Sequence, residues 1–342
     1  MLALRKRHYA GTTSQTPLRL TPYTSARRAE HGLAGNSAET YTMWGTYLRC
    51  CPTILKRKEL NMKNYIEESI NSYHNNKDIP SRSTVLCALK SPAHLRKYLE
   101  GKTKTTDNMK LGIFIHDFIE NGIRIPQHWT TQQEFYQRAT NGRPAGSPKL
   151  DEDGNPLFSY INQNNPEENL TPAKSVLAVS MMSAIENDPF IVSAMDLDDL
   201  VIEPSFYGEI DGMKVKARPD LAFENCNNLI EIKTTSSLDP DDIAREFFEY
   251  GYDVQAFLEL ELSGADSVYF YFISSESPSG TARFVVSRDS VWYTLGKQRA
   301  IEGLKAYYAN KDTTQDSYGR GEITIPISYK AAKYMAERGI EG

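Results

Sequence analysis

The sequence predicts an α/β protein built on one central mixed β-sheet flanked by helices, with a helical portion on its N-terminal side. Three observations support this fold class. Helical patterns dominate residues 62–200, strands alternate with helices over residues 201–310, and two turn signals join the first three of those strands. The 342 residues allow one large α/β domain, or two smaller ones, with an ample core.

Composition narrows the class of protein. Hydrophobic residues make up 40% and charged residues 24%, as is usual for soluble globular proteins, and no apolar run approaches the roughly 20 residues of a membrane span. The net charge of −5 argues against a protein that coats nucleic acid by charge alone. The cysteines lack zinc-finger spacing, so we predict free thiols in a reducing compartment at Cys50, Cys51, Cys87 and Cys226.

Residues 1–61 differ from the rest of the chain. They hold ten Lys/Arg and three Asp/Glu, a net +7, which leaves −12 on the other 281 residues. They are rich in Ser, Thr and Arg and show no sustained periodicity. Three interpretations stay open: a disordered basic arm, a transit-like presequence, or non-native sequence upstream of a start at Met62. We favour the last and place residues 1–61 outside the folded domain.

Caps and periodicity define the helical portion. Ser83 is expected to cap a helix that ends at Lys90, and Ser91 with Pro92 to begin a second one, which Gly101 ends. Further along, the patterns predict a buried helix, a long loop rich in Gly, Pro and Asn, and a helical stretch that begins at Thr171-Pro172: residues 111–120, 141–172 and 171–196.

The second part of the chain alternates strands and helices. Strands are predicted at 201–210, 213–223, 229–234, 267–274 and 281–288. Helices are predicted at 239–262, with a break near Gly251, and at about 289–309. A short strand and a helix are expected in the tail, at 322–340.

Charged residues converge on the strand that contains Leu229-Ile230-Glu231-Ile232-Lys233. Asp211-Gly212 and the polar run 225–228 are turn signals on either side of the strand that ends near Asp220. Because side chains alternate along a strand, Glu231 and Lys233 share one face while the two isoleucines share the other. A hairpin brings the Asp220 carboxylate beside Glu231.

This arrangement favours metal-assisted phosphodiester hydrolysis. Two close carboxylates repel each other unless a proton or cation lies between them, and Mg²⁺ or Mn²⁺ prefers such oxygen ligands. The Lys233 ammonium can then orient a water molecule or stabilise an oxyanion. The alternative is a plain salt bridge between Glu231 and Lys233 on the strand face. The preceding Asp220 argues for the functional interpretation.

The motifs resemble those of a known nuclease family. Pro219-Asp220, ten further residues and Glu231-Ile232-Lys233 resemble the PD-(D/E)XK signature. SRSTVLCALKSPAHLRKYLEG (81–101) and GIFIHDFIE (112–120) are similar to the N-terminal half of the exodeoxyribonuclease VIII, or RecE-like, family of phage and prophage recombination nucleases. VKARPD (215–220), EIKTT (231–235) and YGYDVQAF (250–257) are similar to its C-terminal half.

The resemblance spans about residues 70–275 and implies a restriction-endonuclease-like core. From the sequence pattern we predict a single domain over residues 62–342, comprising helices to 200, the catalytic sheet to 310 and a tail. It implies a Mg²⁺-dependent exonuclease, with Mn²⁺ as a substitute, that digests linear double-stranded DNA from 5′ ends. The 3′ single strands would pass to an annealing protein. The resemblance also implies a homo-oligomer. The implied location is the cytoplasm of a bacterial host, or an organelle if residues 1–61 are a transit peptide. The alternatives are a Cas4-like or single-strand exonuclease, or a catalytically silent DNA-binding module.

Site residues follow from the same resemblance, apart from Glu120, Arg218 and Thr234, which are candidates because of their positions in the sequence. Asp220, Glu231, the Ile232 carbonyl and His116 would bind the metal, and Lys233 would position or activate water. Around them, Glu120 would orient His116, while DNA contacts and site shape would come from Gln255, Tyr252, Arg218 and Thr234. Each has an alternative: a core histidine, a surface acid, a surface ion pair or a plain strand-end threonine. Many relatives have tyrosine where this chain has Glu259, which weakens the role given to Gln255.

A basic stretch offers a path for DNA. Between residues 82 and 110 there are only two acidic residues, Glu100 and Asp107, and seven basic ones. The basic residues are Arg82, Lys90, Arg96, Lys97, Lys102, Lys104 and Lys110. Arg143 and Lys149 could serve in the same way. The alternative is a solvated helix face.

Overall fold

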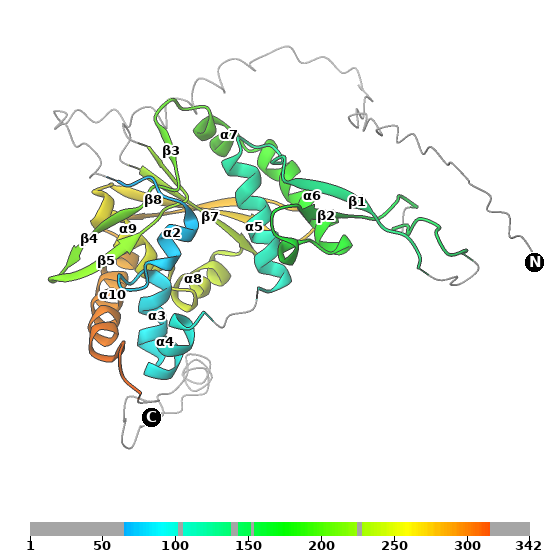
Figure 1. The fold of residues 1–342 in the computed structure, drawn as a ribbon. Coiled ribbons are helices and arrows are strands. Elements are labelled where there is room, and N and C mark those ends of the chain that lie inside the picture. The colour runs from blue at the N-terminus through cyan, green and yellow to red at the C-terminus, as the bar shows by residue number, and fades with distance from the viewer. Residues whose placement is uncertain (1–64, 102–104, 138–142, 152–153, 224–227, 315–342) are drawn as a thin grey trace, which may run out of the picture.

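A five-stranded mixed sheet lies at the centre of the fold (Figure 1). The computed structural model describes residues 65–101, 105–137, 143–151, 154–223 and 228–314. The strand order is β3 (Leu200–Ile202), β6 (Leu221–Phe223), β7 (Asn228–Thr235), β8 (Ser267–Ser274) and β9 (Thr281–Ser287). Only the pairing of β7 with β8 is parallel within this sheet. The predicted α/β class with a central mixed sheet is confirmed.

The two faces of β7 have different roles. Ile230 and Ile232 pack on one side with the buried residues of two helices, α5 (Asp107–Glu120) and α6 (Pro172–Glu186). Leu229 packs on the other side with residues of α8 (Pro240–Glu249) and α9 (Tyr252–Ser263). Glu231 is fully buried on that second side. The predicted alternation along this strand is confirmed.

The remaining helices cover α9. This helix is buried along almost its whole length, between the sheet and α10 (Val291–Asn310). In turn α10 packs against α3 (Arg82–Lys90), which is followed by α4 (Pro92–Leu99) and preceded by α2 (Ile70–Asn75). The break between α8 and α9 falls at Gly251, which has a left-handed backbone (φ 68°), so the predicted break is confirmed.

Two predicted strands prove to be four. Residues 201–210 form β3 and then β4 (Phe206–Ile210), and residues 213–223 form β5 (Met213–Ala217) and then β6. The prediction of continuous strands is wrong because Pro204 and Pro219 have no N–H to continue a ladder. The hairpin at Asp211-Gly212 is confirmed, with positive φ at both residues, but β4 and β5 form a separate two-stranded sheet.

The predicted loop at 141–172 is also wrong. It contains β2 (Phe158–Asn162), which pairs with β1 (Trp129–Gln133), and a 3₁₀ helix, η1 (Pro166–Glu168). Burial of Trp129 and Tyr160 against Phe114 anchors this hairpin to α5. Figure 1 shows the paired strands extending away from the central sheet.

Several helix boundaries shift from those predicted. Ser83 lies inside α3, whose N-cap is Ser81, so the predicted cap is wrong. The predicted helical stretch 171–196 consists of α6 and α7 (Pro189–Met195), because Asp188 caps a new helix. Ser91 caps α4 and Gly101 has positive φ after it, as predicted.

Some predictions fall outside the described residues: those for 1–61 and 322–340 and for Cys50, Cys51 and Cys226. Cys87 is a free thiol, as predicted. Within the described parts of the chain, no helix is both long and apolar enough to cross a membrane.

Replacing Gly296 by alanine is expected to destabilise the fold by about 2 kcal/mol, because overpacking of a close contact has this effect. A Cβ at Gly296 would lie 2.0 Å from the Asp253 carbonyl oxygen, where α10 crosses α9. Urea denaturation measures the effect. Gly112→Ala is the matched control, because its Cβ would meet only Thr234 Oγ1, at 3.6 Å. Equal stability of Gly296→Ala and the parent would contradict the observed packing.

Candidate metal centre and active site

Strand β6 is too short to pair with Ile232 of β7. Leu221 pairs with Ile230, and Pro219, two residues earlier, cannot donate to Ile232. The Ile232 N–H instead donates to Asp220 Oδ2 at 2.6 Å. Asp220 therefore reaches Glu231 from the turn between β5 and β6, and not from within a continuous strand as predicted.

His116 and Glu120 reach the same point from α5. They are four residues apart and share a helix face. His116 Nε2 donates to the Ile232 carbonyl at 3.0 Å, while Nδ1 lies 3.6 Å from Asp220 Oδ1 and 3.6 Å from Glu120 Oε1. The predicted ligands His116 and Asp220 are thus together. The Ile232 carbonyl accepts this hydrogen bond from His116, and the role of the carbonyl as a metal ligand stays a prediction.

The donor set fits a divalent cation. One ligand atom from each of His116, Glu120 and Asp220 lies within 4.8 Å of the others. Glu120 Oε1 is buried and has no hydrogen-bond partner, so its charge favours a cation between the groups. The two carboxylates suit Mg²⁺ or Mn²⁺, while the imidazole nitrogen is a ligand typical of transition-metal ions. Glu120 therefore belongs to the donor set itself, whereas the sequence suggested that it orients His116.

The charges in this cluster influence one another. Burial alone would lower the pKa of His116, but the Asp220 carboxylate and Glu120 raise this pKa to about 9. Burial would raise the pKa of Asp220, but His116 and Lys233 lower it. At neutral pH and without a cation, His116 is therefore protonated and Asp220 is ionised.

Lys233 lies between the two signature carboxylates. Its Nζ is 2.6 Å from Glu231 Oε2 and 3.6 Å from Asp220 Oδ2. The Asp220 N–H donates to Glu231 Oε1 at 3.3 Å. Burial would lower the pKa of Lys233, but the Glu231 and Asp220 carboxylates raise it, so Lys233 stays charged. The structure brings these three residues together, as predicted from the sequence.

A buried network holds Glu231 from behind. Gln255 Nε2 donates to Glu231 Oε2 and, at 2.8 Å, to Glu259 Oε1, while Gln255 Oε1 accepts from Arg82 Nη1 at 2.7 Å. Burial and the Glu231 charge raise the pKa of Glu259 well above its usual value. Gln255 thus positions Glu231, and Glu259 is its second acceptor.

Three other predicted residues lie at the edge of the site. The Tyr252 ring lies 5.7 Å from Lys233 Nζ and 5.6 Å from the Arg82 guanidinium, so it supports the cations. Arg218 pairs with Glu203 at 2.9 Å, but its side chain is only 7% exposed and also donates to Ser205 Oγ, so it is not the surface ion pair of the alternative. Thr234 lines a neighbouring cavity.

Of the basic residues considered for DNA, Arg82 reaches the site through Gln255. In the β1–β2 arm, Lys149 pairs with Glu134 at 3.3 Å, and Arg143 donates to Tyr136 Oη at 3.0 Å. Lys102 and Lys104 lie outside the described residues. The basic stretch therefore contributes to the site mainly at the start of α3.

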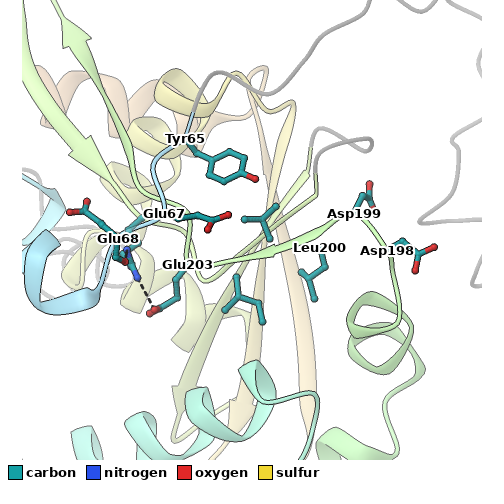
Figure 2. Close-up of a pocket in the computed structure, with 10 residues that line it drawn as sticks. Tyr65, Glu67, Glu68, Asp198, Asp199, Leu200 and Glu203 are labelled. Atoms are coloured by element: carbon teal, nitrogen blue, oxygen red, sulfur yellow. Dashed lines mark hydrogen bonds and ion pairs between the residues drawn. The ribbon is translucent and has the colours of Figure 1, made fainter.

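An acidic cavity adjoins the site on the β3 side. It measures about 560 Å³, and Figure 2 shows the acidic side chains that line it: Glu67, Glu68, Asp198, Asp199 and Glu203. Such a surface repels phosphate. The DNA backbone is therefore expected to approach from another side, where Arg82 and Lys233 lie.

One comparison with known proteins identifies a family for this chain. A family model described as a PDDEXK-like domain of unknown function matches residues 81–315. A candidate exonuclease from Eubacterium rectale is 13% identical, with a TM-score of 0.48, over 80% of this chain and 98% of that chain. A phage-related exonuclease from Haemophilus somnus 129PT is 12% identical, with a TM-score of 0.31, over 67% and 93%. No curated protein matches significantly.

Proposed function

We propose that this chain is a divalent-metal-dependent nuclease. The premise is that the chain belongs to the PDDEXK-like domain family. One observation carries the proposal. Asp220, Glu231 and Lys233 meet around Ile232, whose backbone has no strand partner on the β6 side, beside the His116 and Glu120 pair. A salt bridge on a strand face needs neither the second carboxylate nor the histidine. Hydrolysis of a phosphodiester uses both.

The residues of the site have separate tasks in this reaction. Asp220, His116 and Glu120 would hold the cation, which supplies charge for the phosphate oxygens and a water of lowered pKa. Lys233 is held in its charged form, so it donates hydrogen bonds to the attacking water or to a phosphate oxygen and does not accept a proton. Glu231 fixes the Lys233 ammonium, and Gln255 fixes Glu231.

The finer assignment rests on the sequence motifs. We propose an exonuclease for linear double-stranded DNA that acts in the 5′→3′ direction with Mg²⁺ and leaves 3′ single strands. An annealing partner, a homo-oligomer and a bacterial cytoplasm belong to the same proposal. It treats residues 62–342 as one nuclease domain.

We expect the purified chain to digest a linear duplex with Mg²⁺ and to lose this activity in EDTA. Labelling the 5′ and 3′ ends on separate substrates reports the polarity, since early release of the 5′ label indicates 5′→3′ digestion. A closed circular duplex of the same sequence is the control for the need of an end. Linear DNA that stays intact with both Mg²⁺ and Mn²⁺ would overturn the proposed function.

A further inference from the structure

A cavity of about 280 Å³ adjoins the site on the side of the first turns of α5. Its wall includes Asn108, Gly112, Thr234 and Tyr250, and we name it the Gly112 cavity. Thr234 directly follows Lys233 in β7, and Gly112 lies one helical turn before His116. The cavity is therefore next to the two elements that carry the proposed chemistry.

Gly112 is not required by the packing of the described residues. A Cβ at this position would meet only Thr234 Oγ1, at 3.6 Å, which is an ordinary contact. Glycine inside a helix destabilises it by roughly 0.5–1 kcal/mol relative to alanine. What the missing side chain does provide is open space in the cavity wall, beside the metal-binding residues of the same helix. That space suits a bound molecule.

The chemistry of the wall selects a neutral, hydrogen-bonding group. Its polar residues include Thr234, Ser236 and Ser275 with the amide of Asn108. The lining also includes the Glu246 carboxyl but no lysine or arginine. Lys174, which is not a lining residue, donates from its Nζ to Asn108 Oδ1 at 2.7 Å, and a phosphate would meet no cation among the lining residues. A sugar hydroxyl or a base edge would meet donors and acceptors.

Two apolar side chains at the rim suit a flat ring. Tyr250 is 52% exposed, and its ring centroid lies 5.9 Å from that of Tyr252. Met109 is likewise 52% exposed. Aromatic side chains of this kind are platforms on which single nucleobases stack, whatever their sequence.

We propose that the Gly112 cavity binds the nucleoside next to the scissile phosphate, with its base against Tyr250. This inference rests on the proposed nuclease function. The phosphate lies with the cations, near Lys233, while the uncharged part of the nucleotide enters the cavity that has none. The cavity then positions the strand that is cut, by contacts that do not depend on sequence.

The first test compares variants of Tyr250. Tyr250→Ala is expected to weaken binding of an oligonucleotide about tenfold, since a stacked base contributes roughly that much. Tyr250→Phe keeps the ring and should bind like the parent. Phe248→Ala is the matched control, because Phe248 lies two residues earlier, is 51% exposed and packs on Arg299. Fluorescence anisotropy in EDTA reads binding separately from cleavage.

The second test narrows the cavity by a substitution, or removes from the substrate the base that the cavity would hold. Gly112→Ala keeps the fold but narrows the space, so KM for DNA should rise while the melting temperature does not fall. Substrates with one abasic nucleotide beside the terminal phosphodiester should bind the parent weakly, and Tyr250→Ala should add no further loss.

The outcomes separate the two proposals. If wild-type protein digests DNA but Tyr250→Ala and Gly112→Ala bind and cleave as it does, the nucleoside subsite is wrong and the nuclease stands. If no metal supports digestion while binding depends on Tyr250 and on the base, the nuclease is wrong and only nucleoside binding by the Gly112 cavity stands.

Discussion

Lys233→Ala is expected to reduce the rate of DNA digestion about a thousandfold, the effect of losing a donor aimed at charge that develops during reaction. Its ammonium contacts Glu231 Oε2 at 2.6 Å and lies 3.6 Å from Asp220 Oδ2, so it is fixed before substrate arrives. Initial rates on an end-labelled linear duplex with Mg²⁺ measure the loss. Lys233→Arg should not restore the rate, since a planar guanidinium cannot replace a compact ammonium at this position.

The control for this variant must address stability. Removing Lys233 leaves Glu231 buried without its cation, which destabilises a protein considerably. Melting curves and Mn²⁺ binding by the same preparation establish that the site is still folded. Lys214→Ala, which removes an exposed lysine of β5, should digest DNA at the parent rate. Digestion by folded Lys233→Ala within tenfold of the parent would remove Lys233 from the reaction.

Local signals in the sequence predicted much of the fold. Ser91-Pro92, Gly101 and Gly251 fix helix ends by their own backbone preferences, and Asp211-Gly212 fixes a hairpin. These signals act over a few residues, so they survive without knowledge of tertiary contacts. The β1–β2 pair was missed for the opposite reason. Its order depends on burial of Trp129 and Tyr160 against a helix elsewhere in the chain.

The site divides in the same way. Alternation placed Glu231 and Lys233 on one face because both belong to β7. The position of Asp220 required the knowledge that Pro219 interrupts the strand and leaves the Ile232 N–H for the carboxylate. The contact between Arg82 and Gln255 joins residues 173 positions apart, so no local pattern indicates it. Glu259 had a local signal, since it lies one turn after Gln255, but its raised pKa follows only from its burial beside Glu231.

His116→Ala is expected to lower the affinity for Mn²⁺ about a hundredfold, at the upper end of what neighbours of a metal site contribute. If Glu120 is itself a ligand, Glu120→Gln should cause a comparable loss, because its Oε1, which accepts no hydrogen bond, would no longer carry charge. Isothermal titration calorimetry measures both. His128→Ala is the matched control, since this half-buried histidine pairs with Asp117 at 3.0 Å. Parent affinity in Glu120→Gln would restrict Glu120 to supporting His116.

The pH dependence of the same binding identifies the group that must lose a proton. The pKa of His116 is about 9 without a cation, so at lower pH a proton occupies the imidazole nitrogen that would bind metal. Metal affinity should therefore rise about tenfold per pH unit between pH 6.5 and 8.5 and level off towards pH 9. In His116→Ala this slope should disappear although weak binding remains. If the pH dependence of metal affinity persists in His116→Ala, the proton that the metal displaces belongs to another group.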